Sequence, residues 1–421
     1  MGPDAVAIIP GASIVNRSAD TSYRFRQNSD FWYLTGFDHP DATAILSTLD
    51  GAPAYTLFVQ TRDPAAEVWT GYRPGLEGAT KDYGADHSAD CAGLLEQLPE
   101  SIAGATRLYH AFGQRPDLDR KLIEIQDALR LQSRRGGHPA GQWIDPRSIL
   151  HEMRLLKSEA ELDLMRTAAD ISLEAHGEAA RQIAPGRYEY EIEATLDFVF
   201  RRRGAWGPAY ESIVAGGANA AVLHYVANDK LLREGDMLLI DAGCEYRGYA
   251  SDVTRTYPVG GRFQSPAREL YEVVLTAQEA ALKAAGPGTT LPALHDLTCR
   301  SLAQGMVDIG LLSGDVDDLI RSEAHRRYYM HGTSHWLGLD VHDVGRYTDG
   351  EKARTLEPGM VFTIEPGLYI SENDADAPEA FRGLGVRIED DVVVTTEGIE
   401  NLTSAIPKTA EDIEAWVNDS A

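Results

Sequence analysis

Apolar and polar residues alternate in short blocks through the first third of the chain. Two longer blocks, residues 91–104 and 116–135, carry apolar residues at the spacing of amphipathic helices. Strands mixed with helices in this way predict an N-terminal α/β domain. The blocks with the length and composition of strands span residues 5–11, 31–36, 42–50, 52–60 and 107–113.

The segment RRGGHPAGQWIDPRS, residues 134–148, is rich in glycine and proline and is the best candidate for a domain boundary. A chain of 421 residues is too long for one ordinary hydrophobic core, so we expect two domains. We place the N-terminal domain at residues 1–148 and the second domain at residues 149–421.

The second domain opens with a long helical block, residues 157–183, in which Ser158 and Glu161 form a capping pair. Helical and strand-like blocks then alternate, which predicts an α+β domain. The helical blocks are residues 188–203, 265–285, 291–310 and 316–327, and the strand-like blocks are residues 210–259, 361–370 and 384–396.

Charge and composition narrow the class of protein. With 39 basic and 65 acidic residues the net charge is −26, which argues against binding to nucleic acid or to anionic membranes. No apolar run approaches the ~20 residues of a membrane span. Three scattered cysteines are too few for a disulfide framework, and the first residues lack the pattern of a secretory signal, so we expect a cytoplasmic protein.

The segment IDAGCEYRGYASD, residues 240–252, has an aspartate near each end of a predicted hairpin. If the chain turns between Tyr246 and Arg247, Asp241 lies directly opposite Asp252, with Cβ atoms about 5 Å apart. Two carboxylates that close repel each other unless they share a proton or a cation. In the alternative, the register is shifted, one aspartate is a turn residue, and the two never meet.

The segment HGTSHWLGLDVHD, residues 331–343, contains His331, His335 and His342 among glycines. The glycines argue against a helix, so the spacing of the first two does not indicate a helical zinc site. The one HE pair, His151-Glu152, has Leu155 where a zincin has its second histidine. Three histidines in thirteen residues favour a functional site over ordinary surface or core positions.

Two glutamates interrupt apolar strands. Glu365 lies in VFTIEPGLYI and Glu389 in GVRIEDDVVV, where Arg387 is on the same strand face as Glu389. A buried carboxylate needs a partner or a metal, although Glu389 could also reach solvent or form an ion pair. We interpret Asp390 and Asp391 as solvated turn charges.

Four such carboxylates with one histidine suit hard or borderline divalent cations such as Mn²⁺. Four carboxylates carry too much charge for one cation, so a pair of metals is more plausible than a single ion. Two metals can lower the pKa of a shared water, and hydrolysis is the expected use.

The order of motifs IDAG, SDVTRT, HGTSHWLGLDVHDVG, TIEPGLY and GVRIEDD resembles the Xaa-Pro aminopeptidases (aminopeptidase P). The resemblance extends into the first domain through FRQNSDFWYLTGFDHPDA. It implies a C-terminal pita-bread catalytic domain, a curved antiparallel sheet with flanking helices, behind a smaller N-terminal α/β domain. It also implies removal of the first residue from peptides with proline second, by attack of a hydroxide that bridges two metals.

The resemblance assigns roles to individual residues. It implies a dinuclear centre of Mn²⁺, with Zn²⁺ or Co²⁺ as alternatives, in which Asp252 and Glu389 bridge both ions. Glu365 would also accept a proton from the attacking water. The implied metal ligands are Asp241, Asp252, His335, Glu365 and Glu389; the implied catalytic residues are Glu365, His224 and His342; and the implied substrate pocket and metal surroundings include His331, Tyr210, Tyr369, Arg387 and Trp69. Trp69 would belong to a loop that lines a neighbour's pocket in a homodimer or homotetramer.

Three alternatives remain at this point. A prolidase would cleave Xaa-Pro dipeptides and would need a cation, such as Arg73 or Arg354, for the substrate carboxylate. A binding protein on the same fold would have lost metal ligands, and a creatinase-type hydrolase would lack the carboxylate set; this chain has all of them.

Overall fold

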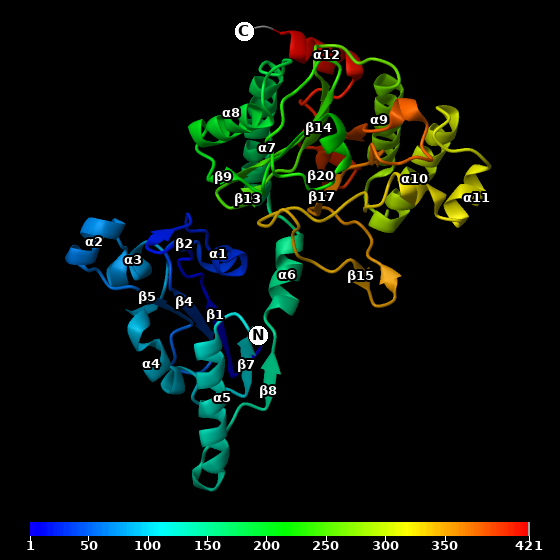
Figure 1. Ribbon diagram of the computed structural model, residues 1–421. Coiled ribbons are helices and arrows are strands. Elements are labelled where there is room, and N and C mark those ends of the chain that lie inside the picture. Colours follow the sequence, from blue (N-terminus) through cyan, green and yellow to red (C-terminus); the bar gives the residue numbers. More distant parts are fainter. Residues whose placement is uncertain (420–421) are drawn as a thin grey trace. The chain divides into compact units, whose positions relative to one another are not determined.

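A computed structural model describes residues 1–419 of the chain and contains two compact units, Met1–His151 and Glu152 onward (Figure 1). The expected boundary at 148/149 lies inside helix α6 (Arg147–Leu155). No helix in residues 1–419 has both the length and the apolar character needed to cross a membrane.

The N-terminal unit contains a six-stranded sheet with the order β6-β5-β4-β1-β7-β8. All residues of the central strand β1 are buried, which explains why AVAIIP is an unbroken apolar run. Alternate side chains of β1 pack into two different hydrophobic cores. Val6 and Ile8 belong to one core, and Ala7 and Ile9 belong to the other. The strands are β1 (Ala5–Pro10), β4 (Thr43–Ser47), β5 (Tyr55–Val59), β6 (His87–Asp90), β7 (Arg107–His110) and β8 (Gln142–Ile144), with a separate pair β2 (Asn16–Ser18) and β3 (Thr21–Ser22).

The prediction of a strand at residues 31–36 is wrong, because this segment lies in helix α1 (Ser29–Thr35). The Asn28 side chain accepts the Phe31 N–H at the start of the helix, and Gly36 ends it with φ 61°. The two capping residues therefore outweigh the aromatic content of FWYLTG. The other helices of this unit are α2 (Pro64–Thr70), α3 (Gly75–Lys81), α4 (Leu94–Ser101) and α5 (Pro116–Leu131).

The second unit is built from helices around short antiparallel strands. The predicted capping pair is present at α7, where Glu161 accepts the Ser158 N–H at 2.8 Å. Figure 1 shows β14 (Thr254–Pro258) and β20 (Asp390–Val394) between α7 and α8 on one side and α9 and α10 on the other. The helices are α7 (Glu159–Ala180), α8 (Glu189–Arg202), α9 (Ala267–Ala284), α10 (Leu291–Asp308), α11 (Val316–Arg321) and α12 (Ala410–Asn418).

The strands of the second unit form several small sheets rather than one continuous sheet. Two three-stranded sheets, β10-β11-β14 and β17-β20-β21, and the pair β18-β19 supply most of the candidate site. The strands are β9 (Gly207–Pro208), β10 (Ile213–Gly216), β11 (Met237–Asp241), β12 (Cys244–Tyr246), β13 (Tyr249–Ala250), β14 (Thr254–Pro258), β15 (Thr348–Asp349), β16 (Lys352–Ala353), β17 (Val361–Ile364), β18 (Gly367–Tyr369), β19 (Gly385–Arg387), β20 (Asp390–Val394) and β21 (Ile399–Asn401).

The predicted register of the hairpin is wrong, because the centre of the turn lies one residue further along the chain than expected. Tyr246 pairs with Tyr249 across a turn at Arg247 and Gly248, which have φ angles of 50° and 88°. Such a two-residue turn with positive φ matches the twist of antiparallel strands. Asp241 therefore pairs with Thr254 instead of Asp252.

Candidate metal centre

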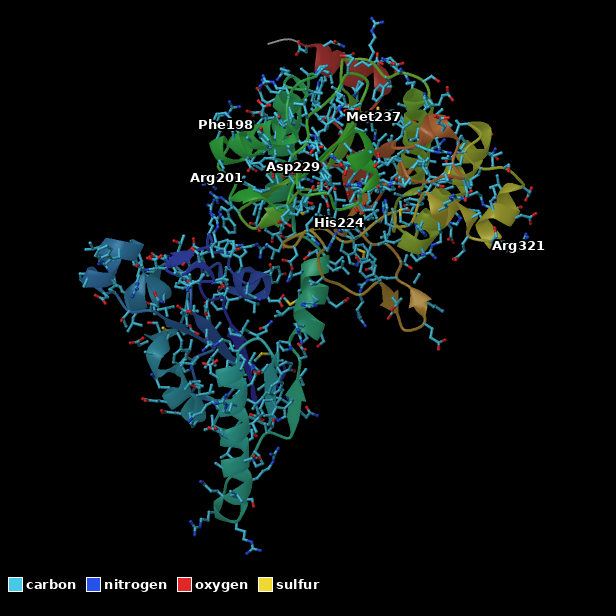
Figure 2. All side chains as sticks on the ribbon, in the orientation of Figure 1. Phe198, Arg201, His224, Asp229, Met237 and Arg321 are labelled. Carbon is cyan, nitrogen blue, oxygen red and sulfur yellow. The ribbon has the colours of Figure 1, made fainter. Side chains whose placement is uncertain are left out.

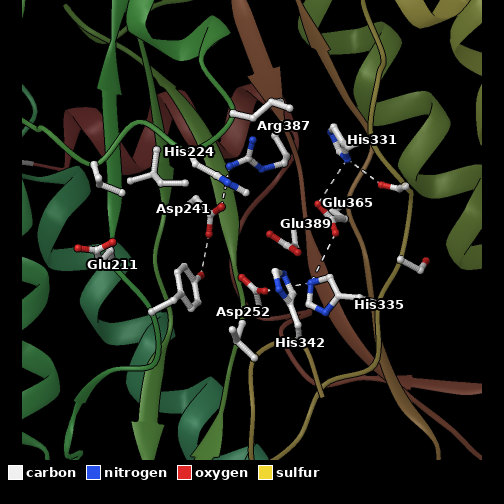
Figure 3. A pocket seen from close by; sticks show the side chains of 17 residues that line it. Glu211, His224, Asp241, Asp252, His331, His335, His342, Glu365, Arg387 and Glu389 are labelled. Carbon is white, nitrogen blue, oxygen red and sulfur yellow. Dashed lines mark hydrogen bonds and ion pairs between the residues drawn. The ribbon is translucent and has the colours of Figure 1, made fainter. Parts of the chain in front are cut away.

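One cavity of about 440 Å³ in the second unit gathers the residues that the motifs indicated (Figure 3). The Tyr369 hydroxyl contacts two residues of the cavity lining, His331 and Arg387. Trp69 lies on α2 of the N-terminal unit with 87% of its surface exposed. The predicted residues that line the cavity are Tyr210, His224, Asp241, Asp252, His331, His335, His342, Glu365, Arg387 and Glu389.

The five candidate ligands are brought together by the ends of strands. Asp241 is the last residue of β11, and Asp252 lies two residues before β14. Glu365 directly follows β17, and Glu389 directly precedes β20. His335 is fixed by its backbone N–H, which donates to the Thr363 hydroxyl at 3.2 Å.

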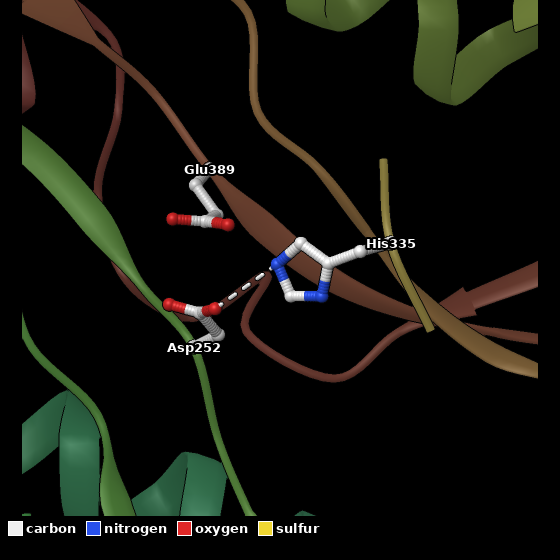
Figure 4. Close-up of side chains that lie close together, drawn as sticks. All are labelled: Asp252, His335 and Glu389. Carbon is white, nitrogen blue, oxygen red and sulfur yellow. Dashed lines mark ion pairs between the residues drawn. The ribbon is translucent and has the colours of Figure 1, made fainter. Parts of the chain in front are cut away.

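Three of these side chains form a compact group of potential ligands. Ligand atoms of Asp252, His335 and Glu389 all lie within 4.8 Å of one another (Figure 4). His335 Nε2 is 3.3 Å from Asp252 Oδ2 and 3.5 Å from Glu365 Oε1. One imidazole among carboxylates is a donor set that suits divalent cations such as Mn²⁺ or Zn²⁺.

The carboxylates of the site hold more negative charge than the nearby cations balance. Burial raises the pKa of Glu365 to about 7, although His335 and Arg387 oppose it. Burial also raises the pKa of Glu389 well above its usual range, with the charge of Asp252 adding to the effect. Divalent cations bound between these groups would neutralise this charge, so the residues fit a metal centre.

The other two carboxylates among the candidate ligands, Asp252 and Asp241, each have a basic side chain close by. Burial acts to raise the pKa of Asp252, but the hydrogen bond and charge of His335 lower it overall. Asp241 accepts hydrogen bonds from the Tyr210 hydroxyl at 2.7 Å and from Arg387 Nη2 at 2.6 Å. These contacts hold the Asp241 carboxylate in one orientation, as partners of metal ligands commonly do.

The interpretation of Asp390 and Asp391 as solvated turn charges is wrong, because both residues are buried. Asp390 accepts hydrogen bonds from Arg255 at 2.6 Å and Lys408 at 2.7 Å, and these cations hold its pKa far below the usual range despite burial. Asp391 Oδ2 accepts the backbone N–H of Asp252 at 3.0 Å. The two aspartates thus support the segments just before β14 and β20, where Asp252 and Glu389 lie.

The histidines differ in their surroundings. His331 Nε2 lies 2.8 Å from the Tyr369 hydroxyl, and burial lowers the pKa of His331 to about 4, so this ring is neutral at pH 7. His342 packs edge-on against His335 with ring centroids 4.4 Å apart. His224 lines the cavity, is exposed, and follows the short 3-10 helix Gly217–Ala221; it is labelled in Figure 2.

The motifs did not indicate every residue of the cavity. Thr254 was missed, although its hydroxyl donates to Glu389 Oε2 at 2.7 Å and accepts from Arg387 Nε at 3.0 Å. Its place in SDVTRT, two residues after Asp252, was the available indication. Thr254 does not itself line the cavity; the lining residues that were missed are Glu211, Ile213, Leu223, Val226, Gly332, Ser334 and Val341.

Known proteins resemble this chain in sequence and in overall fold. Residues 163–396 match the model of metallopeptidase family M24, and residues 1–109 match that of the aminopeptidase P N-terminal domain. The chain belongs to metallopeptidase family M24. This membership confirms the resemblance and the expected class of fold, an α+β catalytic domain behind an N-terminal domain.

Curated relatives and solved structures match nearly the whole chain. The chain is 45% identical to a Xaa-Pro aminopeptidase of Escherichia coli over 99% of its own length and 94% of that protein. It matches the structure of Pseudomonas aeruginosa aminopeptidase PepP with a TM-score of 0.97 at 45% identity, covering 100% of this chain and 95% of that one. A zinc-substituted E. coli aminopeptidase P in complex with product matches with a TM-score of 0.96 at 44% identity, over 100% and 96% of the two chains.

Proposed function

We propose that this protein is a dinuclear metal-dependent aminopeptidase that removes the first residue from peptides with proline in second position. The observation that carries the proposal is the convergence of all five candidate ligands on one cavity of a family M24 chain. The substrate class comes from the relatives, which include Xaa-Pro aminopeptidases and aminopeptidase P structures of 44–45% identity.

Asp241, Asp252, His335, Glu365 and Glu389 would hold the two cations, with Asp252 and Glu389 shared between them. When bound, the cations supply positive charge that polarises the scissile carbonyl and acidifies the attacking water. The bond before proline is a tertiary amide without an N–H. Polarising its carbonyl and activating a water do not require that N–H, so this chemistry is suited to the bond.

Glu365 is suited to take the proton of the attacking water. Its carboxylate lies 3.5 Å from His335 Nε2 and 3.7 Å from His331 Nδ1, at the junction of β17 and β18. His224 and His342 line the same cavity and can donate hydrogen bonds to the oxyanion that develops on the scissile carbonyl. Asp241, at the edge of the ligand group, is the expected contact for the free amine of the substrate.

The cavity favours an aminopeptidase over a prolidase. Arg387 is the only arginine or lysine among the residues that line it, and Arg387 donates to Asp241, Tyr369 and Thr254. Arg354, one candidate for the carboxylate of a dipeptide, is bound to Glu152 instead. Arg73, the other candidate, belongs to the N-terminal unit.

Further properties belong to the same proposal. Mn²⁺ is the expected metal because the site is rich in oxygen donors, with Zn²⁺ or Co²⁺ as alternatives. We place the protein in the cytoplasm, in keeping with three free cysteines. The expected loop at Trp69 is helix α2 in the structure. A homodimer or homotetramer in which Trp69 lines a neighbour's pocket from this helix is supported by the high exposure of that side chain.

Product analysis by mass spectrometry tests the activity. The protein is stripped of metal, reloaded with Mn²⁺, and offered Ala-Pro-Ala and Ala-Pro in parallel. Release of alanine from the tripeptide is the expected result. Cleavage of the dipeptide alone would establish a prolidase, and cleavage of neither with metal bound would favour a binding protein.

A further inference from the structure

The catalytic cavity contains a carboxylate that the metal centre does not use. Glu211 lines the cavity and is exposed, and among residues 1–419 it has no hydrogen-bond or ion-pair partner. Figure 3 shows it beyond Asp241, on the side of the pocket away from His335. A carboxylate in this place is available to a substrate.

Strand geometry relates Glu211 to the candidate ligand Asp241. Ile213 and Asp241 are directly opposite each other in the β10–β11 pair, so their side chains share a face. Glu211 and Ile213 both line the cavity, whereas Ser212 between them does not, as expected for an extended segment. At about 3.3 Å per residue, Glu211 lies about 7 Å along the chain from Ile213.

The spacing of about 7 Å between Ile213 and Glu211 matches the reach of a long substrate side chain. In the proposed function, on which this inference rests, Asp241 contacts the free amine of the substrate's first residue. The side chain of that residue then passes over Ile213 and Leu223, which pack together and line the cavity. Lysine and arginine bury their methylene groups on such apolar surface while the charged end reaches a polar partner.

The charges around Glu211 are also negative. Burial raises the pKa of Glu193 on α8, a hydrogen bond with Asn228 opposes this, and the charges of Asp197 and Glu211 raise it further. Glu211 is therefore close enough to Glu193 for their charges to interact. The one cation in the cavity lining, Arg387, is held by Asp241.

We propose that Glu211 selects peptides whose first residue is lysine or arginine, by pairing with the side-chain cation. The residue thus sets a preference at the first position, while the metal centre and the proline requirement stay as described above.

Arg-Pro-Ala and citrulline-Pro-Ala test the proposal, because citrulline has the length of arginine without its charge. The wild-type protein should cleave Arg-Pro-Ala with a kcat/KM about fivefold higher than that for citrulline-Pro-Ala. This is the size of effect expected for a solvent-exposed ion pair. The ratio should fall toward one in 1 M NaCl, which screens the pair. In Glu211→Gln the ratio should be near one already at low salt.

Glu279→Gln is the matched control, because Glu279 is exposed on α9 and the change removes the same charge outside the cavity. This control should keep the wild-type ratio. In Glu211→Arg the preference should invert, so that Glu-Pro-Ala is cleaved better than Gln-Pro-Ala.

A wild-type ratio near one, or an unchanged ratio in Glu211→Gln, would overturn the role of Glu211. Equal loss on both peptides in that variant would overturn it too, since it would mean that the carboxylate does not recognise the side chain. If the wild type releases alanine from Ala-Pro-Ala, such results concern Glu211 alone. If it cleaves no tripeptide, the proposed function fails, and dissociation constants for the arginine and citrulline peptides from calorimetry decide the role of Glu211.

Discussion

At the scale of single residues, the site depends on groups that hold the candidate ligands in place. The candidate ligands could be picked out from the sequence because each carboxylate lies within an apolar strand or beside one of its ends. Their partners could not, since Arg255 and Asp390 are 135 positions apart and meet only in the folded chain. The sequence predicts an exposed Asp390, because its burial depends on the contacts with Arg255 and Lys408 and these are not visible in the local sequence.

Thr254 is the residue whose role in the site is most easily isolated. Thr254→Val keeps the shape of the side chain but removes the hydroxyl that donates to Glu389 and accepts from Arg387. Metal affinity should fall about tenfold or more, as is common when a partner of a metal ligand is lost. Competition with a chelating dye measures this. The exposed Thr276→Val is the control, and equal affinity of both variants would contradict the role of Thr254.

His224 should act on the reaction without holding metal. Its ring lines the cavity but does not belong to the compact group of Asp252, His335 and Glu389. His224→Ala should therefore keep its metal content and lose on the order of 100-fold in kcat, the usual effect of removing one oxyanion donor. Steady-state kinetics on Ala-Pro-Ala with parallel metal analysis checks both expectations, and unchanged turnover would exclude this role.

At the scale of elements, the long helices and four strands of the N-terminal sheet, β1, β4, β5 and β7, followed from apolar patterns and capping residues. The capping pair at Ser158 is one example. The segment at residues 31–36 failed because aromatic content suggested a strand, while Asn28 and Gly36 impose a helix. The hairpin register failed because it depends on which residues take positive φ, and Arg247 was not an obvious choice beside Gly248.

Helix α7 is joined to the metal-site strands by a buried histidine. His176 contacts the Tyr257 hydroxyl at 3.0 Å and the Ala242 carbonyl at 2.9 Å, and burial lowers its pKa from 6.5 to about 4. Between these pH values the unfolded chain binds a proton that the folded chain does not, so stability falls as the pH drops from 6.5 to about 4.

This effect should cost up to about 3 kcal/mol of unfolding free energy over that range. His176→Gln keeps hydrogen-bonding groups but cannot titrate, so its stability should depend less on pH. Urea unfolding of both proteins from pH 7 to pH 4 measures the difference. A constant difference in unfolding free energy across this range would show that His176 does not titrate on unfolding.

At the scale of the whole molecule, the chain divides its tasks between two units. The candidate ligands and the cavity belong to the unit from Glu152 onward, and the six-stranded sheet belongs to Met1–His151. Length and the glycine- and proline-rich segment were enough to predict two domains. The small sheets of the second unit could not be derived from periodicity, because strands of two to five residues give too short a pattern.

Metal binding should stabilise one unit more than the other. A ligand that binds only the native state raises its stability, so removing metal with a chelator should lower the melting temperature of the second unit. Differential scanning calorimetry should show one transition that shifts by several degrees and one that does not. Two transitions that both stay unchanged would contradict a metal centre in this unit.

The metal content of Asp252→Ala tests the dinuclear centre most directly. A carboxylate oxygen of Asp252 lies within 4.8 Å of potential ligand atoms of both His335 and Glu389. We propose that Asp252 is shared by the two cations. After reloading with Mn²⁺ and desalting, elemental analysis should give about two ions per chain for the wild type and almost none for the variant. Full metal content in Asp252→Ala would contradict the assignment of this cavity as a centre built around a shared aspartate.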